Sequence, residues 1–153
     1  MLKIKINDLN GPQIADLLRR HLDHMFAITP AASVYALDME ALRVPAITFW
    51  SASLEGQLVG CVALKDHGNG LGEIKSMHTL AEFRGQGIAR KLVAHLIEVA
   101  REQKFERLSL ETGKTEHFEP AKKLYASFGF VQSAPFADYG PDPHSHFMTL
   151  VLR

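Results

Sequence analysis

The chain has 153 residues, of which 46% are hydrophobic, and equal numbers of basic and acidic side chains, so its formal net charge is zero. This length suits one hydrophobic core, so we expect residues 1–153 to form a single domain, and the neutral charge argues against nucleic-acid and membrane partners. The single cysteine excludes an internal disulfide and thiolate metal clusters and favours a reducing compartment. Because the first residues lack an apolar signal-peptide core, we expect a cytoplasmic location.

The N-terminal third predicts one strand followed by two helices. Residues 3–6 (KIKI) alternate apolar and charged side chains as a strand does, and apolar residues then recur at helical spacing from Ile14 to Met25. Thr29-Pro30 would end that helix. Ser33 is a suitable N-cap for a second helix over residues 33–42 (SVYALDMEAL).

The remainder predicts three consecutive strands and then alternating helices and strands. Two runs rich in β-branched and aromatic residues, 46–54 and 57–65, flank a short turn at Glu55-Gly56, which favours an antiparallel hairpin. Further elements are expected in this order: a strand at 73–80, a long helix from Ile88, a strand at 107–112, a helix at 120–128, and strands at 130–134 and 146–152. This order is typical of a mixed α/β sheet.

The segment FRGQGIARKL (residues 83–92) places two glycines directly before the long helix. Glycine permits positive φ at such a turn, and the unpaired N–H groups of the first helical turn can then bind an anion. A P-loop would need a Gly-Lys-Ser/Thr ending, which is absent, and a dinucleotide fingerprint needs a small residue where Arg90 stands. At this point a coenzyme phosphate site and a turn that only caps the helix both stay open.

The spacing Arg84-x-x-Gly87-x-Ala89 resembles the Gln/Arg-x-x-Gly-x-Gly/Ala motif of the GNAT superfamily of acyl-coenzyme A-dependent N-acyltransferases. Residues 121–130 (AKKLYASFGF) resemble the family's late Ala-x-x-Leu-Tyr-x-x-x-Gly-Phe signature, although the same residues would also form an ordinary core-facing helix stripe. Within the superfamily, SVYALDMEAL, KSMHT, RLSLETG and PFADYGPDP are most similar to small stand-alone bacterial acetyltransferases of the YsnE-like kind. The resemblance implies an α/β fold with a mixed, mostly antiparallel central sheet flanked by helices on both faces.

The resemblance also implies where the co-substrate, acetyl-coenzyme A, would bind. Its pyrophosphate is expected on the glycine segment, at Arg84, Gly85, Gln86, Gly87, Ile88, Ala89 and Arg90. The backbone of Met77, His78 and Thr79, on a strand that splays from its neighbour in this family, would bind the pantetheine arm and polarise the thioester carbonyl. Many members have an asparagine where this chain has Phe118, so that contact to the pantetheine is lost, replaced by packing, or supplied by Glu116 or His117.

The implied chemistry is direct acetyl transfer from acetyl-coenzyme A to a primary amine of a small molecule, through a tetrahedral intermediate and without a metal. Tyr125 would protonate the leaving thiolate, and Glu73 would accept the amine's proton, the alternative for Glu73 being an exposed carboxylate at a strand end. Candidate acceptor contacts are Lys75, Tyr35 and Tyr139.

Other residues and other functions fit the sequence less specifically. Cys61 stands in a buried-strand pattern, which disfavours a covalent route through its thiol, and His144-x-His146 is more typical of a polar loop than of a metal site. Acetylation of a protein N-terminus or lysine, and a non-catalytic coenzyme A sensor, remain alternatives. We expect a monomer or a homodimer.

Overall fold

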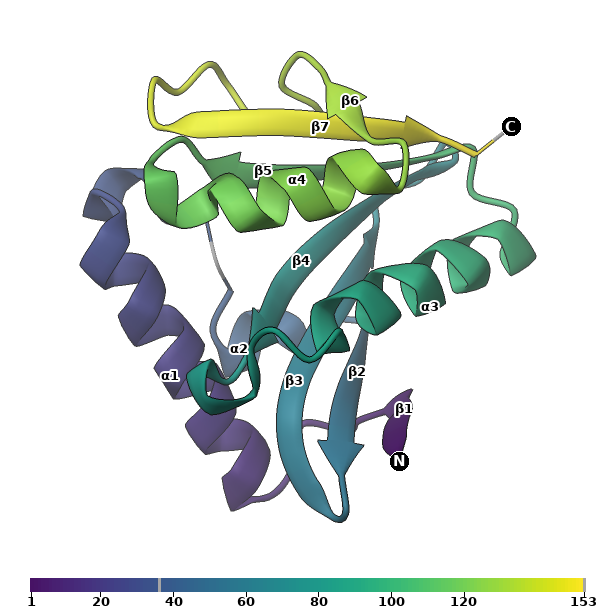
Figure 1. Ribbon diagram of the computed structural model, residues 1–153. Coiled ribbons are helices and arrows are strands. Elements are labelled where there is room, and N and C mark those ends of the chain that lie inside the picture. The colour runs from purple at the N-terminus through teal and green to yellow at the C-terminus, as the bar shows by residue number, and fades with distance from the viewer. Residues whose placement is uncertain (36, 153) are drawn as a thin grey trace.

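The computed structural model describes residues 1–35 and 37–152. Within them the strands form one seven-stranded mixed sheet in the order β1-β2-β3-β4-β5-β7-β6 (Figure 1). The strands are β1 (Leu2–Ile6), β2 (Ile47–Leu54), β3 (Gln57–Asp66), β4 (Leu71–Thr79), β5 (Arg107–Gly113), β6 (Val131–Gln132) and β7 (Ser145–Val151). The helices are α1 (Pro12–Ile28), α2 (Met39–Leu42), α3 (Ile88–Glu102) and α4 (Glu119–Ser127), with short 3-10 turns at Ala31–Ser33, Ala81–Phe83 and Glu116–Phe118.

Helices cover both faces of the sheet, as the sequence predicted. Alternate side chains of β3 point to opposite faces of the sheet. Val62 and Leu64 pack in a core with α3 and α4, whereas Cys61 and Ala63 pack in a core with α1 and α2. This alternation follows from the two-residue period of a strand. Every strand pair in the described chain is antiparallel except β4 with β5.

The predicted hairpin turn is confirmed, since Glu55 and Gly56 both have positive φ (49° and 84°) between β2 and β3. The predicted second helix is wrong over most of its length. Ser33 ends a 3-10 turn instead of capping a helix, and α2 begins only at Met39, where the Asp38 carboxylate accepts the Ala41 N–H at 2.9 Å. Position 36 of the predicted helix lies outside the described residues.

Tertiary hydrogen bonds explain why that helix does not form. The Ser33 hydroxyl donates to Asp142 Oδ1 at 3.0 Å, and the Tyr35 hydroxyl donates to Asp142 Oδ2 at 2.6 Å. These contacts join two segments more than a hundred residues apart, and they replace the local capping bond that the sequence suggested. The segment after α1 is thereby attached to the loop before β7.

Two strands also differ from the prediction in length. β4 begins at Leu71, so Glu73 is its third residue, and the prediction of an exposed strand-end carboxylate as the alternative for Glu73 is wrong, because this residue is only 2% exposed. β6 is confined to Val131–Gln132, shorter than the predicted 130–134. Among the described residues, none of the helices combines the length and the apolar character that crossing a bilayer requires.

Candidate functional site

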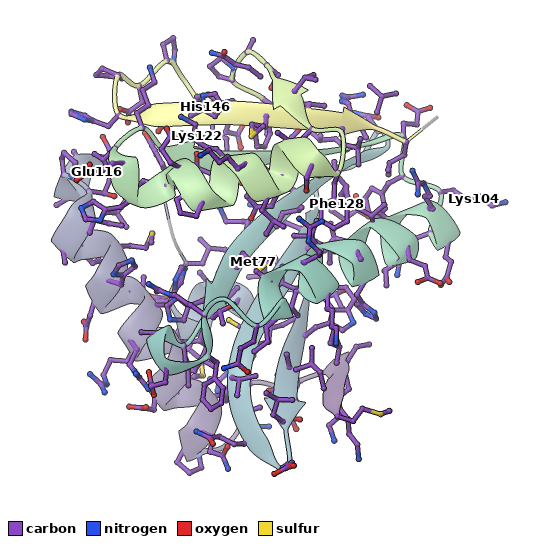
Figure 2. The ribbon with its side chains drawn as sticks, viewed as in Figure 1. Met77, Lys104, Glu116, Lys122, Phe128 and His146 are labelled. Atoms are coloured by element: carbon purple, nitrogen blue, oxygen red, sulfur yellow. The ribbon has the colours of Figure 1, made fainter. Side chains whose placement is uncertain are left out.

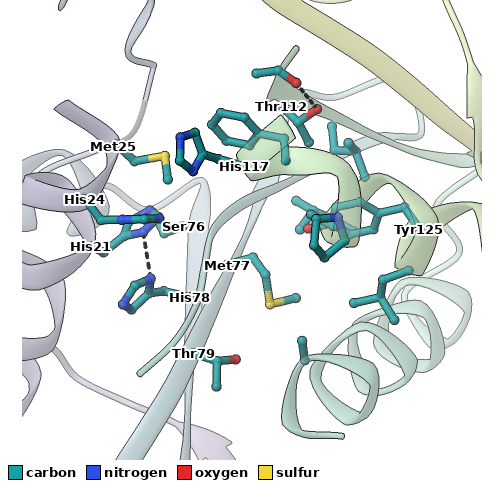
Figure 3. A pocket seen from close by; sticks show the side chains of 18 of the residues that line it. His21, His24, Met25, Ser76, Met77, His78, Thr79, Thr112, His117 and Tyr125 are labelled. Atoms are coloured by element: carbon teal, nitrogen blue, oxygen red, sulfur yellow. Dashed lines mark hydrogen bonds between the residues drawn. The ribbon is translucent and has the colours of Figure 1, made fainter. Parts of the chain in front are cut away.

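A cavity of about 720 Å³ opens where β4 and β5 separate (Figure 3). The two strands pair in parallel only where Leu71–Glu73 of β4 lie beside Arg107–Ser109 of β5. Beyond these residues the two strands diverge toward α1, as Figure 1 shows. Residues of α1, β4, β5 and α4 and the N-terminus of α3 line the cavity. The opening that the family resemblance implied for the fourth strand is therefore present.

A bulge in β4 redirects the strand at this opening. Two steps along β3, from Cys61 to Ala63, match three steps along β4, from His78 to Lys75, so β4 carries one extra residue. Ser76 within this stretch has φ of 53°, a conformation that a non-glycine residue seldom adopts and that commonly marks functional positions. After the bulge the Met77 side chain packs toward the α3 core while His78 faces α1.

The glycine segment forms one end of the cavity. Gly85 and Gly87 have φ of 79° and 80°, and a methyl group added at either position would contact nothing within 4 Å, so the backbone here is open to a ligand. No side chain caps the N-terminus of α3. Its first N–H groups therefore point outward with the positive end of the helix dipole, which suits a pyrophosphate. All residues from Arg84 to Arg90 line the cavity except Gln86.

The two arginines of this segment are held in different ways. Arg84 Nε donates to the Thr79 carbonyl at 3.4 Å, across the end of β4. Arg90 donates to Ser127 Oγ at 3.2 Å, and its guanidinium lies 5.2 Å from the ring centroid of Phe128, so it joins α3 to the end of α4. Figure 2 labels Phe128 at that end of α4. Both guanidinium groups add positive charge beside the uncapped helix.

Tyr125 projects from α4 into the same cavity, on the side opposite His21 and His24 of α1 (Figure 3). It is 5% exposed and packs edge-on against Phe130, with ring centroids 5.6 Å apart. Burial raises the pKa of Tyr125 above its usual value, so its phenol keeps its proton at neutral pH. A protonated phenol beside a leaving group can donate a proton to it.

Glu73 lies on the α1 side of β4 and is tightly bound by neighbouring side chains. His67 Nε2 lies 2.8 Å from Oε1, while the Tyr139 hydroxyl donates to Oε2 at 2.6 Å and Lys75 Nζ donates to the same oxygen at 3.2 Å. Both carboxylate oxygens of Glu73 are therefore occupied within the chain.

The three candidate acceptor contacts meet around this carboxylate. Lys75 Nζ also donates to the Tyr139 hydroxyl at 2.9 Å and to the Tyr35 carbonyl at 3.3 Å, and the Tyr35 and Tyr139 rings meet edge-on at 5.2 Å. Burial, followed by the negative charge of Glu73, raises the pKa of Tyr139, and the hydrogen bond to Asp142 raises that of Tyr35. Lys75 and Tyr35 line the cavity, whereas Tyr139 lies behind them.

Two histidines form a buried pair on the α1 side of the cavity (Figure 3). His21 Nδ1 of α1 lies 3.2 Å from His78 Nδ1 of β4, so one ring donates and the other accepts. Burial lowers the pKa of His21 to about 4 and that of His78 to about 3. Both imidazoles are therefore neutral at pH 7. The sequence did not predict this pair.

Glu111 of β5 is a cavity-lining carboxylate that the sequence prediction missed. Burial raises its pKa to about 7, with the Ser145 hydroxyl and the Lys75 ammonium acting in the opposite direction. The available signal was its position in the strand RLSLET, two residues beyond Ser109 on the same face. Without the register between β4 and β5, that position did not identify a cavity.

Phe118, in place of the family's asparagine, packs against the end of β5. A methyl group added at Gly113 would overlap its ring, so the glycine and the aromatic side chain fit together. Of the alternatives for this position, the structure shows packing of Phe118. Cys61 is fully buried, its thiol donates to the Ser76 carbonyl at 3.2 Å, and burial raises the pKa of that thiol, which makes it a poor nucleophile. No cluster suited to a metal ion occurs among residues 1–35 and 37–152.

Comparisons with known proteins agree with this geometry. Residues 13–130 match the model of the acetyltransferase (GNAT) family. The chain is 51% identical over 151 residues to the uncharacterized N-acetyltransferase YsnE of Bacillus subtilis, covering 99% of this chain and all of that protein.

Two solved structures have the same fold. A Klebsiella pneumoniae protein provisionally assigned as an acyl-CoA N-acyltransferase superposes with a TM-score of 0.81 at 29% identity, covering 100% of this chain and 99% of the other. A GNAT acetyltransferase from Elizabethkingia anophelis, solved with acetyl-CoA bound, superposes with a TM-score of 0.68 at 18% identity, covering 98% and 97% of the two chains. The parted β4 and β5, the uncapped glycine turn and the family match over most of the chain lead to one conclusion: this protein is an acetyltransferase and belongs to the GNAT family.

Proposed function

We propose that the protein transfers an acetyl group from acetyl-coenzyme A to a primary amine of a small molecule. The observation that carries this proposal is the continuity of one cavity. At one end lie the outward N–H groups of α3, at the other lie the carboxylates of Glu73 and Glu111, and Tyr125 projects between α3 and β5. Such a cavity can hold a long phosphorylated thioester with its acyl end beside acid and base groups.

The residues of this chain would bind the coenzyme mainly through their backbone. The segment from Arg84 to Arg90, including Gln86, would hold the pyrophosphate, with the two arginines adding charge-assisted contacts. The exposed strand edge at Met77, His78 and Thr79 would pair with the pantetheine arm, since β4 no longer bonds β5 there. An N–H group of this edge would polarise the thioester carbonyl and stabilise the oxyanion that forms on attack.

The chemical step then needs one proton donor and one proton acceptor. Tyr125, kept protonated by burial, would donate to the departing thiolate. A primary ammonium has a pKa near 10 and must lose a proton before it attacks, for which Glu73 is the acceptor that the family resemblance suggests. In this structure both oxygens of Glu73 already accept hydrogen bonds from neighbouring side chains.

A small acceptor is favoured over a protein side chain because a loop segment bonded to Asp142 borders the acceptor end. The segment at Ser33–Tyr35 is tied to Asp142, so it forms a wall of the cavity beside Lys75. Lys75 and Tyr35 would contact the acceptor there, and Tyr139 would hold Lys75 in place. Acetylation of a protein N-terminus or lysine is the second candidate. It would require this wall to open.

The test is calorimetry with acetyl-coenzyme A, followed by a thiol-release assay over free amino acids, diamines, arylethylamines and a lysine-containing peptide. We expect binding in the micromolar range and release of coenzyme A thiol with at least one small amine. Release with the peptide alone would favour the protein acetyltransferase. Binding without release on any acceptor would favour a coenzyme A sensor, and no binding at millimolar coenzyme would refute the proposal.

A further inference from the structure

We propose that Glu111 of β5, and not Glu73, accepts the proton of the attacking amine, and that Glu73 is a positioning residue. This inference rests on the proposed acetyl transfer. The sequence pattern indicated Glu73 as the proton acceptor and did not indicate Glu111. The inference therefore exchanges the catalytic role between these two residues. The two carboxylates differ in strand register, in hydrogen bonding and in the charges around them.

Register places Glu111 at the mouth of the opening between the strands. The parallel pairing joins Leu71 to Arg107 and Glu73 to Ser109, and the next same-face pair in that register would be Lys75 with Glu111. The strands part before that pair forms. Glu111 therefore lies on the α1 side of the sheet, at the first same-face position beyond the last pair of β4 with β5, and it lines the cavity.

The two carboxylates differ in how many of their oxygens are free. Glu73 receives donors on both oxygens, from His67 on Oε1 and from Tyr139 and Lys75 on Oε2. Glu111 receives one side-chain donor, the Ser145 hydroxyl, at 2.8 Å from Oε2. Within the described residues its Oε1 makes no side-chain hydrogen bond. A carboxylate has about four lone-pair sites, and a base needs a free one directed at its proton. Glu73 already accepts three hydrogen bonds and Glu111 accepts one, so Glu111 keeps a whole oxygen open to a proton.

Electrostatics suit Glu111 to this role near neutral pH. Its environment is half-buried, and the ammonium of Lys75, its nearest cation by register, is already paired with Glu73. The charged and titratable groups that act on it from the surrounding elements are Glu73 and Lys75 of β4, Asp142 and Tyr139 of the loop before β7, and Tyr35 after α1. Burial is the largest effect and raises the pKa of Glu111 to about 7, so this carboxylate changes its protonation near neutral pH.

The proton balance of the step can be written completely. The Glu111 carboxylate takes one proton from the ammonium, and the free amine nitrogen forms a bond to the thioester carbon. The C–S bond then breaks, and the thiolate takes the Tyr125 phenolic proton. The second proton of the attacking nitrogen returns to the Tyr125 phenolate through water, and Glu111 releases its proton to solvent. One ammonium and one thioester give one amide, one thiol and one proton.

Glu73 has a different function in this scheme. It holds Tyr139 and Lys75 against the segment that carries Tyr35, so it shapes the acceptor end of the cavity. Replacing it with glutamine would disturb the binding of the acceptor more than the proton transfer. The two glutamates can therefore be distinguished by the kinetic parameter that each one changes.

The test compares Glu111→Gln, Glu111→Asp, Glu73→Gln and the surface control Glu102→Gln, with the amine that gives the fastest thiol release in the panel above. In the wild type we expect kcat/KM to rise with pH around a midpoint near 7. Glu111→Gln should lower kcat about 100-fold and abolish that rise. Glu73→Gln should raise KM for the amine and keep the rise, and Glu102→Gln should match the wild type.

The outcomes separate this inference from the proposed function. A wild-type protein that releases no thiol with any amine would refute the transferase and this step together. An active wild type whose Glu111→Gln variant keeps both its kcat and its pH profile would refute the assignment of Glu111 alone. If Glu111→Gln does not fold, Glu111→Asp decides, because a shortened base must change both the rate and the midpoint. An unchanged profile in that variant would also overturn the assignment.

Discussion

The two ends of the cavity are built in different ways. The end beside α3 is made mainly of backbone from one continuous segment, residues 84–90, whose glycines and uncapped N–H groups need no distant partner. The acceptor end is made of side chains from β4, β5 and two loops, joined by hydrogen bonds such as those from Tyr139 to Glu73 and from Tyr35 to Asp142, which span 66 and 107 residues. The first end depends on local conformation, and the second depends on the whole fold.

This difference teaches where sequence similarity is informative in such a protein. A phosphate site made of backbone tolerates few substitutions in a short segment, so a short motif identifies it. An acceptor site made of side chains from distant segments can be rebuilt by changing a few loop residues, while the coenzyme end remains the same. Substitutions at the two ends, and at the groups between them, should therefore change different measured quantities.

The chemical groups between the two ends should control rate without controlling coenzyme affinity. Tyr125→Phe removes the phenolic proton but keeps the ring that packs on Phe130. We expect kcat to fall by roughly 10²–10⁴-fold while the Kd for acetyl-coenzyme A changes less than about twofold, as measured by thiol release and calorimetry. A Tyr125→Phe variant with wild-type kcat would show that the side chain of Tyr125 has only a structural role.

The acceptor end should make stability depend on pH through its histidine pair. The folded-state pKa values of His21 and His78 lie below that of an unfolded-chain histidine, so the unfolded state binds protons first as pH falls. Stability contributed by the neutral rings is present above about pH 6.5 and is lost as pH falls toward 4, by on the order of 3 kcal/mol for one such histidine.

Chemical denaturation of His21→Asn at pH 7 and pH 4.5 checks this expectation. The variant should lose less stability between the two pH values than the wild type does, whereas the exposed-side-chain control His144→Gln should lose as much as the wild type. Equal losses in His21→Asn and in the wild type would show that the buried pair does not govern the acid sensitivity.

The coenzyme end should respond to backbone changes that leave the acceptor end alone. Gly87→Ala introduces a side chain at φ of 80°, which strains the turn by about 1–2 kcal/mol and pushes a methyl group toward the ligand. We expect acetyl-coenzyme A to bind about tenfold more weakly, which corresponds to about 1.4 kcal/mol. The matched control is Gly56→Ala in the β2–β3 turn, at φ of 84° and also without a neighbour within 4 Å. Equal coenzyme affinity in the two variants would contradict the role given to Gly87.

Most of the fold could be predicted from the sequence, because it depends on local patterns. Alternating strands, the amphipathic α3 and the Glu55-Gly56 turn are determined by residues close together in the chain. The prediction of a second helix was wrong because the Ser33 and Tyr35 side chains bond Asp142 instead of groups in their own segment. No local sequence pattern indicates that contact. Tertiary bonds outweighed capping preference there.

The candidate site likewise contains features that could be predicted from the sequence and features that could not. The glycine segment and the splayed β4 lie where the family resemblance implied, and Tyr125 projects into the cavity between them. The three hydrogen bonds of Glu73, the His21–His78 pair and the position of Glu111 could not be predicted, because each depends on the register or packing of elements far apart in the chain. These are also the features that distinguish the acceptor end.

The most direct test of where the coenzyme binds is an amide NMR titration of the ¹⁵N-labelled protein with acetyl-coenzyme A. We expect the largest shifts on residues 84–90 and on residues 77–79, with little change in β1 and β2. Shifts of this kind would place the pyrophosphate on the α3 turn and the thioester in the opening between β4 and β5. If saturating coenzyme left the amide shifts of both segments unchanged, the coenzyme would have to bind elsewhere.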